Sequence, residues 1–218
     1  MFEPKLPRRT CRDLFRHRAP ADFRVARPGA FRDMSKFRQM DLYFHVDAPP
    51  AEVWRAYMRT SPLAIWPGAP CRLQALYLPS KKLAIDADRL EGAWKRFEKG
   101  MKVFVDMSAL PPLPWPAMMV GLEIVRLDAR RRVVEFRYLE GSPSWGAQVM
   151  EFTPERGGTR VLHRTWYRSY SAVVEKLYPW YHRLMIHRMH AAFARELAGR
   201  SKASSGRTSR SSRRASSG

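Results

Sequence analysis

The chain has 218 residues, which is enough for one globular domain with extensions or for two small domains at most. Hydrophobic residues make up 45% of it, enough for a packed core, and 40 Lys/Arg against 20 Asp/Glu give a formal net charge of +20. No apolar run approaches the roughly 20 residues that cross a bilayer. Cys11 and Cys71 lack the spacing of a metal site or a disulfide framework, so a cytoplasmic location is expected.

The positive charge is concentrated at the two ends of the chain. Residues 1–40 hold eleven Lys/Arg and four Asp/Glu, and residues 201–218 hold five Lys/Arg and no acid. A dedicated nucleic-acid-binding protein concentrates its charge on a folded surface instead. The basic ends are therefore interpreted either as solvated tails or as accessory anchors. As anchors, they would make weak, nonspecific contact with nucleic acid or anionic membrane.

The N-terminal part is predicted to be a leader followed by a strand and a short helix. Residues 1–38 are basic, contain proline and show no hydrophobic period, which indicates a loosely ordered leader before a domain at 39–199. Leu42–Val46 alternates like a strand. Pro49 and Pro50 then suit the first turn of a helix that reaches Met58.

The middle of the chain changes from helical to strand-like patterning. Prolines and Gly68 interrupt short helical pieces between residues 60 and 100, and Leu90–Lys99 is expected to be another helix. Ala109–Pro116, with four prolines, is expected to be a loop. Short turns separate the later strands, which predicts an antiparallel meander. The expected strands are Met101–Asp106, Met118–Leu127, Arg132–Leu139, Trp145–Thr153 and Thr159–Arg168.

The pattern becomes helical again near the C-terminus. Pro179 is expected to begin a helix, because the residue before a proline avoids helical geometry. An apolar stripe then continues to Leu197, and Gly199 is a natural stop. Residues 200–218 are rich in Ser and Arg, which predicts a disordered tail. The order of elements is that of an α+β domain.

Two stretches carry a resemblance to a known superfamily. They are Val46–Trp54, with the sequence VDAPPAEVW, and Glu151–Val161, with the sequence EFTPERGGTRV. Residues 41–198 resemble the START-like, Bet v 1-like (SRPBCC) helix-grip superfamily, which includes polyketide cyclases and small lipid- or metabolite-binding proteins. The resemblance implies a curved antiparallel sheet wrapped around a long C-terminal helix, with a cavity between them. The loop at 109–116 and the proline at 179 depart from it.

Strand alternation predicts which side chains would face that cavity. Charged residues alternate with apolar ones on three strands, and the apolar face is taken as the inner one. The resulting chamber is mostly apolar with a few polar groups, as small-molecule pockets are, and methionines add an adaptable lining. The expected ligand-binding residues are Phe136, Tyr138, Gln148, Met150, Phe152, His163, Thr165, Tyr167, Met185 and Met189. The alternative is that they fill a packed core.

Candidate chemistry is sparse. His163 is the one weak candidate for proton transfer, because an unperturbed histidine titrates near neutral pH. A structural, hydrogen-bonded histidine is the competing interpretation. His187 and His190 share a helix face, but Arg183 and Arg188 would repel a cation, so neither a metal nor another cofactor is expected. Aromatic residues near arginines, such as Trp166, are assigned to the sheet rather than to base stacking.

Three functions remain open from the sequence. The first is binding of a hydrophobic or aromatic small molecule, a lipid or a metabolite, in the cavity. The second is a polyketide cyclase/aromatase-like enzyme in which His163 moves a proton. The third is a surface-interaction protein whose basic tails dock on nucleic acid or anionic membrane. Whether the protein is an enzyme is left undecided.

Overall fold

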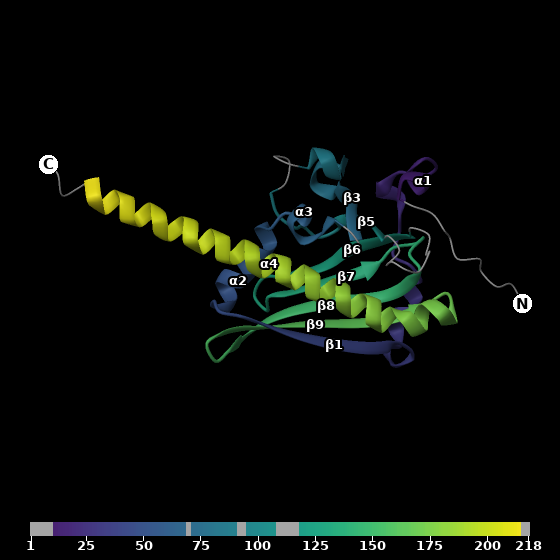
Figure 1. The fold of residues 1–218 in the computed structure, drawn as a ribbon. Helices are drawn as coiled ribbons and strands as arrows, with labels where there is room; N and C mark the ends of the chain where they lie inside the picture. The colour runs from purple at the N-terminus through teal and green to yellow at the C-terminus, as the bar shows by residue number, and fades with distance from the viewer. Residues whose placement is uncertain (1–10, 69–70, 91–94, 108–117, 215–218) are drawn as a thin grey trace, which may run out of the picture.

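The computed structural model describes residues 11–68, 71–90, 95–107 and 118–214, and one sheet dominates it (Figure 1). In these residues the sheet has nine antiparallel strands. Eight of them follow the order β1-β9-β8-β7-β6-β5-β3-β2, and the ninth, β4, pairs with β3 outside this order. The strands are β1 (Arg38–Val46), β2 (Pro67–Gly68), β3 (Cys71–Leu78), β4 (Leu83–Asp86), β5 (Lys102–Met107), β6 (Met118–Asp128), β7 (Val133–Tyr138), β8 (Ser144–Glu155) and β9 (Gly158–Ser169). The curved antiparallel sheet predicted from the sequence is confirmed.

The hairpin between β8 and β9 shows why glycine occurs there. Gly157 has a φ of +81°, which lies in the left-handed region that favours glycine. A Cβ on Gly158 would lie 2.2 Å from the carbonyl oxygen of Val46. This close approach lets β1 pair with β9 along its whole length, from Arg38 opposite Tyr167 to Val46 opposite Thr159.

A long helix covers one face of the sheet. Helix α4 (Ala172–Arg214) crosses the sheet and extends beyond it at its C-terminal end, while α2 (Pro50–Arg59) and α3 (Pro62–Ile65) lie near its middle (Figure 1). Its inner face contributes Ile186, Met189, Phe193 and Leu197 to the main hydrophobic core. The expected helix-grip arrangement is therefore present.

Two expectations about this helix are corrected. It begins at Ala172 rather than at Pro179, which lies inside it, and it continues through the segment expected to be a disordered tail, as far as Arg214. Proline removes one backbone hydrogen bond from a helix interior. Burial of Val174 before the proline, and of His182 after it, outweighs that local preference.

Part of the opposite face of the sheet is covered by residues that the sequence assigned to a loose leader. Helix α1 (Cys11–Phe15) and three short 3-10 turns, η1 (Pro20–Asp22), η2 (Pro28–Arg32) and η3 (Met34–Lys36), precede β1. We call residues 11–37 the N-terminal arm. Its Cys11 and Phe23 form a second core cluster with Ala75, Phe104, Met119 and Leu139 of the sheet. The expectation of loose order is wrong for the arm, which the sheet holds by apolar burial.

Backbone hydrogen bonds also fasten the arm. The N–H of Ala26 donates to the carbonyl of Tyr138 at 2.8 Å, and the N–H of Glu140 donates to the carbonyl of Arg24 at 2.9 Å. The buried ammonium of Lys102 donates to the carbonyls of Phe23, at 2.7 Å, and Ala21. These contacts supply partners for a charged group that would otherwise be costly to bury.

Strands β3 and β4 were not predicted. A bulge between Leu73 and Ala75 shifts the register of β3, so its alternation breaks there. As a result Leu76 joins the main core and Ala75 the core under the arm. The helix expected at Leu90–Lys99 is not seen in residues 95–99, where the chain has no helix; residues 91–94 and the loop expected at 109–116 lie outside the described residues.

Candidate functional site

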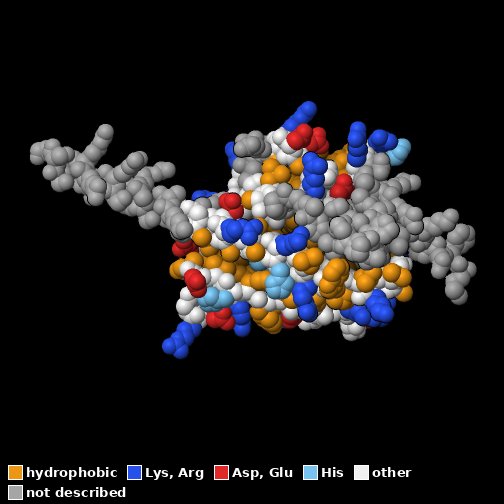
Figure 2. Space-filling model, viewed as in Figure 1, with side chains coloured by type: hydrophobic (Ala, Val, Ile, Leu, Met, Phe, Trp, Pro, Cys, Tyr) orange, Lys and Arg blue, Asp and Glu red, His pale blue; other side chains and the backbone are white. Residues whose placement is uncertain are grey.

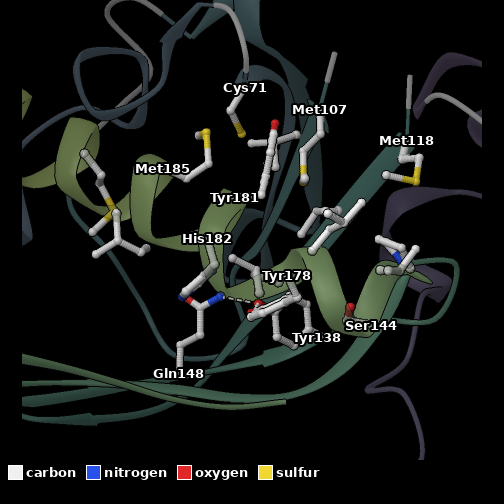
Figure 3. A pocket seen from close by; sticks show the side chains of 18 of the residues that line it. Cys71, Met107, Met118, Tyr138, Ser144, Gln148, Tyr178, Tyr181, His182 and Met185 are labelled. Carbon is white, nitrogen blue, oxygen red and sulfur yellow. Dashed lines mark hydrogen bonds between the residues drawn. The ribbon is translucent and has the colours of Figure 1, made fainter. Parts of the chain in front are cut away.

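A cavity of about 160 Å³ lies between the sheet and the first half of α4 (Figure 3). Strands β3, β5, β6, β7 and β8 supply one wall, and α4 supplies the other. The lining is almost entirely apolar. The residues that line it are Trp66, Cys71, Val105, Met107, Met118, Val120, Leu122, Tyr138, Pro143, Ser144, Gln148, Val174, Leu177, Tyr178, Trp180, Tyr181, His182, Met185, Ile186 and Met189.

Four of the ten expected ligand-binding residues line this cavity. They are Tyr138, Gln148, Met185 and Met189. The other six point inward, as alternation predicted, but they do not line the cavity; they are Phe136, Met150, Phe152, His163, Thr165 and Tyr167. Phe152, for example, packs against the rings of Trp54 and Tyr57, with centroids 5.5 and 5.3 Å away. These six residues belong to the packed core and to the layer behind the cavity wall.

Sequence reasoning missed several polar residues of the wall, among them Tyr178 and His182. The ring of Tyr178 stacks between Tyr167 and His182, with centroids 3.9 and 4.9 Å away. Tyr178, His182, Met185 and Met189 follow one another at helical spacing on the inner face of α4. The signal was present in the sequence, but beginning the helix at Pro179 placed Tyr178 outside it.

A chain of hydrogen bonds connects the cavity wall to the core. The Nε2 of Gln148 donates to the hydroxyl of Tyr138 at 2.6 Å, and that hydroxyl is hydrogen-bonded to the hydroxyl of Tyr178. Behind the wall, Oε1 of Gln148 lies 3.1 Å from Nε2 of His163, and Nδ1 of His163 lies 3.3 Å from Nε2 of His190. These hydrogen bonds link strands β7, β8 and β9 to one another. They also join the sheet to α4 at two points, Tyr138–Tyr178 and His163–His190.

The Gln148 side chain shows which groups donate and which accept in this series of hydrogen bonds. Its carbonyl oxygen can only accept, so Nε2 of His163 carries the proton and donates. Nδ1 of the neutral His163 ring then accepts from Nε2 of His190. Burial lowers the pKa of His163 to about 3 and holds the pKa of His190 well below its usual range. Both rings are therefore uncharged at neutral pH, and His163 acts as a connecting group.

The titratable side chains of the cavity wall are also uncharged at neutral pH. Burial raises the pKa of Cys71 and of Tyr138 to about 12, and raises the pKa of Tyr178 and Tyr181 further above their usual values. Burial lowers the pKa of His182, whose Nε2 lies 2.9 Å from the hydroxyl of Thr165. Among the described lining residues there is no Lys, Arg, Asp or Glu. The described part of the wall therefore presents no group that titrates near pH 7.

Of the other described histidines and tryptophans, only Trp66 and Trp180 line the cavity. His187 is exposed and His190 is buried, although both rings contact Phe44. In the described part of the chain, no three His, Cys, Asp or Glu side chains are grouped to hold a metal ion. Trp166 donates to Oε1 of Gln39 on the neighbouring strand.

The cavity meets the surface at the start of α4. Trp180 is 61% exposed and Leu177 is 37% exposed, yet both line the cavity. Val173, one turn before Leu177, is 57% exposed. Hydrophobic side chains are visible on the surface over these first turns of α4 (Figure 2). This end of the helix therefore forms an apolar rim at one side of the cavity.

Comparisons with known proteins identify the fold. No protein-family model matches the sequence, and no curated protein is detectably similar to it. A point mutant of norcoclaurine synthase from Thalictrum flavum, in complex with a transition-state analogue, superposes with a TM-score of 0.54 at 13% identity, over 76% of this chain and 96% of that one. The same synthase in complex with dopamine and hydroxybenzaldehyde gives 0.50 at 14% identity, over 77% and 91%. A protein from Thermus thermophilus gives 0.51 at 15% identity, over 75% and 99%.

The sheet, the gripped helix and these superpositions define a helix-grip protein. Its fold is that of the Bet v 1-like proteins, as the resemblance in the sequence implied. Identities this low establish the fold alone. No helix in the described ranges is both long and apolar enough to span a membrane.

Proposed function

We propose that the protein binds a hydrophobic small molecule in the cavity between its sheet and α4. The observation that carries the proposal is the cavity wall itself, which is apolar and whose titratable groups are all uncharged at neutral pH. Apolar burial, on the order of 25 cal/mol per Å², would supply the affinity. Aromatic rings from Tyr178 and Trp180 favour a ligand with an aromatic or flat apolar part.

The fold is compatible with this function but does not specify which ligand is bound. Norcoclaurine synthase has been solved with dopamine and hydroxybenzaldehyde, so the same architecture accommodates small aromatic molecules in that protein. The methionines at 107, 118, 185 and 189 give this cavity a lining that can adapt to the shape of a ligand.

The cyclase alternative is less well supported. A general acid or base works best when its pKa is near the operating pH and when it reaches the reacting group. His163 meets neither condition, because burial lowers its pKa to about 3 and it lies behind Gln148. The cavity therefore supports binding better than proton transfer by His163.

Binding can be tested with the neutral fluorescent probe N-phenyl-1-naphthylamine. Replacing Met185 by Trp should fill part of the cavity and weaken probe binding about tenfold or more, since overpacking of this size is costly. His187→Trp is the matched control, because His187 is exposed on the same helix and does not line the cavity. Equal affinities for wild type and Met185→Trp would rule out this cavity as the binding site. Native mass spectrometry of the purified protein would show any ligand carried over from the host cell.

A further inference from the structure

The hydroxyls of Tyr138 and Tyr178 form a hydrogen-bonded pair at the cavity wall (Figure 3). Tyr138 reaches this point from β7, and Tyr178 reaches it from α4. The Nε2 of Gln148 donates to the Tyr138 hydroxyl at 2.6 Å. Among the residues that the structure describes, the hydrogen bonds of these hydroxyls are to Gln148 and to each other.

Counting hydrogens shows that this pair has one donor to spare. A tyrosine hydroxyl carries a single hydrogen, so the pair has two. The bond between Tyr138 and Tyr178 uses one of them, whichever oxygen is the donor. The amide of Gln148 contributes its own hydrogen and cannot accept, because its carbonyl oxygen faces His163 instead. Among the described residues, one hydroxyl hydrogen is therefore left without an acceptor in an apolar wall.

We propose that the ligand is an uncharged, largely apolar molecule with a hydrogen-bond acceptor, such as a ketone or an ester, and that the Tyr138–Tyr178 pair donates to it. This inference rests on the proposed function, since it concerns the ligand of the same cavity. It explains why an otherwise apolar wall contains a polar pair held from behind by Gln148 and His163. A buried donor without a partner is costly, so the acceptor of a ligand would remove that cost.

The wall also limits the charge of the ligand. The described lining residues include no Lys or Arg to pair with a carboxylate, and no Asp or Glu to pair with an ammonium. An unpaired charge in such surroundings would carry a large desolvation cost. Because burial raises the pKa of both tyrosines, the pair keeps its donor hydrogen over the whole neutral and mildly alkaline range.

Two naphthalenes of nearly the same shape provide the test. 2-Acetylnaphthalene carries a carbonyl where 2-isopropenylnaphthalene carries a methylene, so only the former can accept a hydrogen bond. Each would compete against N-phenyl-1-naphthylamine on wild-type protein and on the double variant Tyr138→Phe/Tyr178→Phe. The ratio of alkene to ketone dissociation constants should be about threefold to tenfold larger in the wild type than in the double variant, the usual size of a neutral hydrogen bond.

The single variants and a control sharpen the test. Tyr138→Phe and Tyr178→Phe each leave one hydroxyl, and each therefore keeps a hydrogen to donate; each should retain most of the ketone preference. Tyr43→Phe, which changes an exposed tyrosine on β1, should leave the wild-type ratio unchanged.

A ratio that is equal in the wild type and the double variant would overturn the acceptor proposal while leaving the binding function standing. If neither naphthalene nor the fluorescent probe binds the wild type, the proposed function fails and the acceptor proposal fails with it.

A spectroscopic measurement keeps the proposal testable even if the double variant does not fold. The carbonyl stretch of 2-acetylnaphthalene labelled with carbon-13 at the carbonyl can be isolated by infrared difference spectroscopy against the unlabelled compound. In complex with wild-type protein, the band should lie at lower frequency than in a hydrocarbon solvent, because a hydrogen bond weakens the C=O bond. A band at the hydrocarbon frequency would overturn the proposal.

Discussion

His163 is held inside the protein as an uncharged imidazole. It is 1% exposed, and both ring nitrogens have hydrogen-bond partners, Gln148 on one side and His190 on the other. The residue type suggested proton transfer, because a free histidine titrates near neutral pH. Burial among β8, β9 and α4 removes that property and converts His163 into a structural connection between the core and the cavity wall.

This burial predicts that the protein loses stability in mild acid. In the unfolded chain, the pKa of His163 returns to about 6.5, whereas in the folded protein it is about 3. Between these values the unfolded state binds more protons, so the contribution of His163 is complete above pH 6.5 and declines as the pH falls. We expect this residue alone to lower the free energy of unfolding by about 1.4 kcal/mol per pH unit once the pH is well below 6.5, and by about half that slope at pH 6.5. His182 and His190 act in the same direction.

Urea denaturation between pH 7.5 and 5.5 would measure this dependence. His163→Asn should reduce the total fall in unfolding free energy over this range by about 1.4 kcal/mol relative to wild type, because the unfolded-state histidine titrates in the middle of the range. Val161→Ala is the control, because Val161 is buried on the same face of β9 and does not titrate. It should lower stability at every pH and keep the wild-type slope. An unchanged slope in His163→Asn would show that the ring is already charged or exposed in the folded protein.

At the scale of elements, period-2 alternation was the most reliable signal. The strands from Met118 onward were predicted close to their observed bounds, and their apolar faces do point toward α4. Strand β3 was missed because its bulge interrupts the alternation and because the arm buries its other face as well. The arm was missed because it is made of one short helix and three 3-10 turns, which have no extended hydrophobic period.

The arm should contribute measurably to stability. Phe23 is 2% exposed, and its ring packs edge-on against Phe15 and Phe104. Phe23→Ala should therefore lower the free energy of unfolding by about 3–5 kcal/mol, the usual cost of removing a buried phenylalanine. Phe37→Ala, at the other end of the arm, removes a half-buried ring outside both core clusters and should cost less than half as much. Chemical denaturation would compare the two variants, and equal losses would mean that the arm is not docked in solution.

At the scale of the whole molecule, the net charge and the cavity favour different kinds of partner. The net charge of +20 promotes nonspecific attraction to polyanions, whereas the cavity is apolar and its titratable groups are uncharged at neutral pH. The basic ends thus remain a proposal for accessory electrostatic contact. Removing residues 1–38 would be a poor test of it, because residues 11–37 cover the sheet.

A truncation that spares the arm separates the two properties. A variant lacking residues 1–10 and 201–218 should bind a single-stranded DNA oligonucleotide more weakly and with a shallower dependence on salt, because it has fewer lysines and arginines. Its affinity for N-phenyl-1-naphthylamine should equal that of the full chain. Fluorescence anisotropy at 50 and 200 mM salt would measure the first effect. Oligonucleotide binding that does not change with salt or truncation would point to a specific site on the folded domain.

The sequence by itself determined the antiparallel meander, the final helix and the inward face of each late strand, because those features follow from side chains a few residues apart. Only the tertiary structure decided which inward side chains line a cavity and which fill the core. Tyr138 lines the cavity, whereas His163 is packed behind it. This difference depends on the summed volumes of side chains from five strands and α4. The same holds for the arm and for the pairing of Tyr138 with Tyr178, since residues distant in the chain must meet before either contact exists.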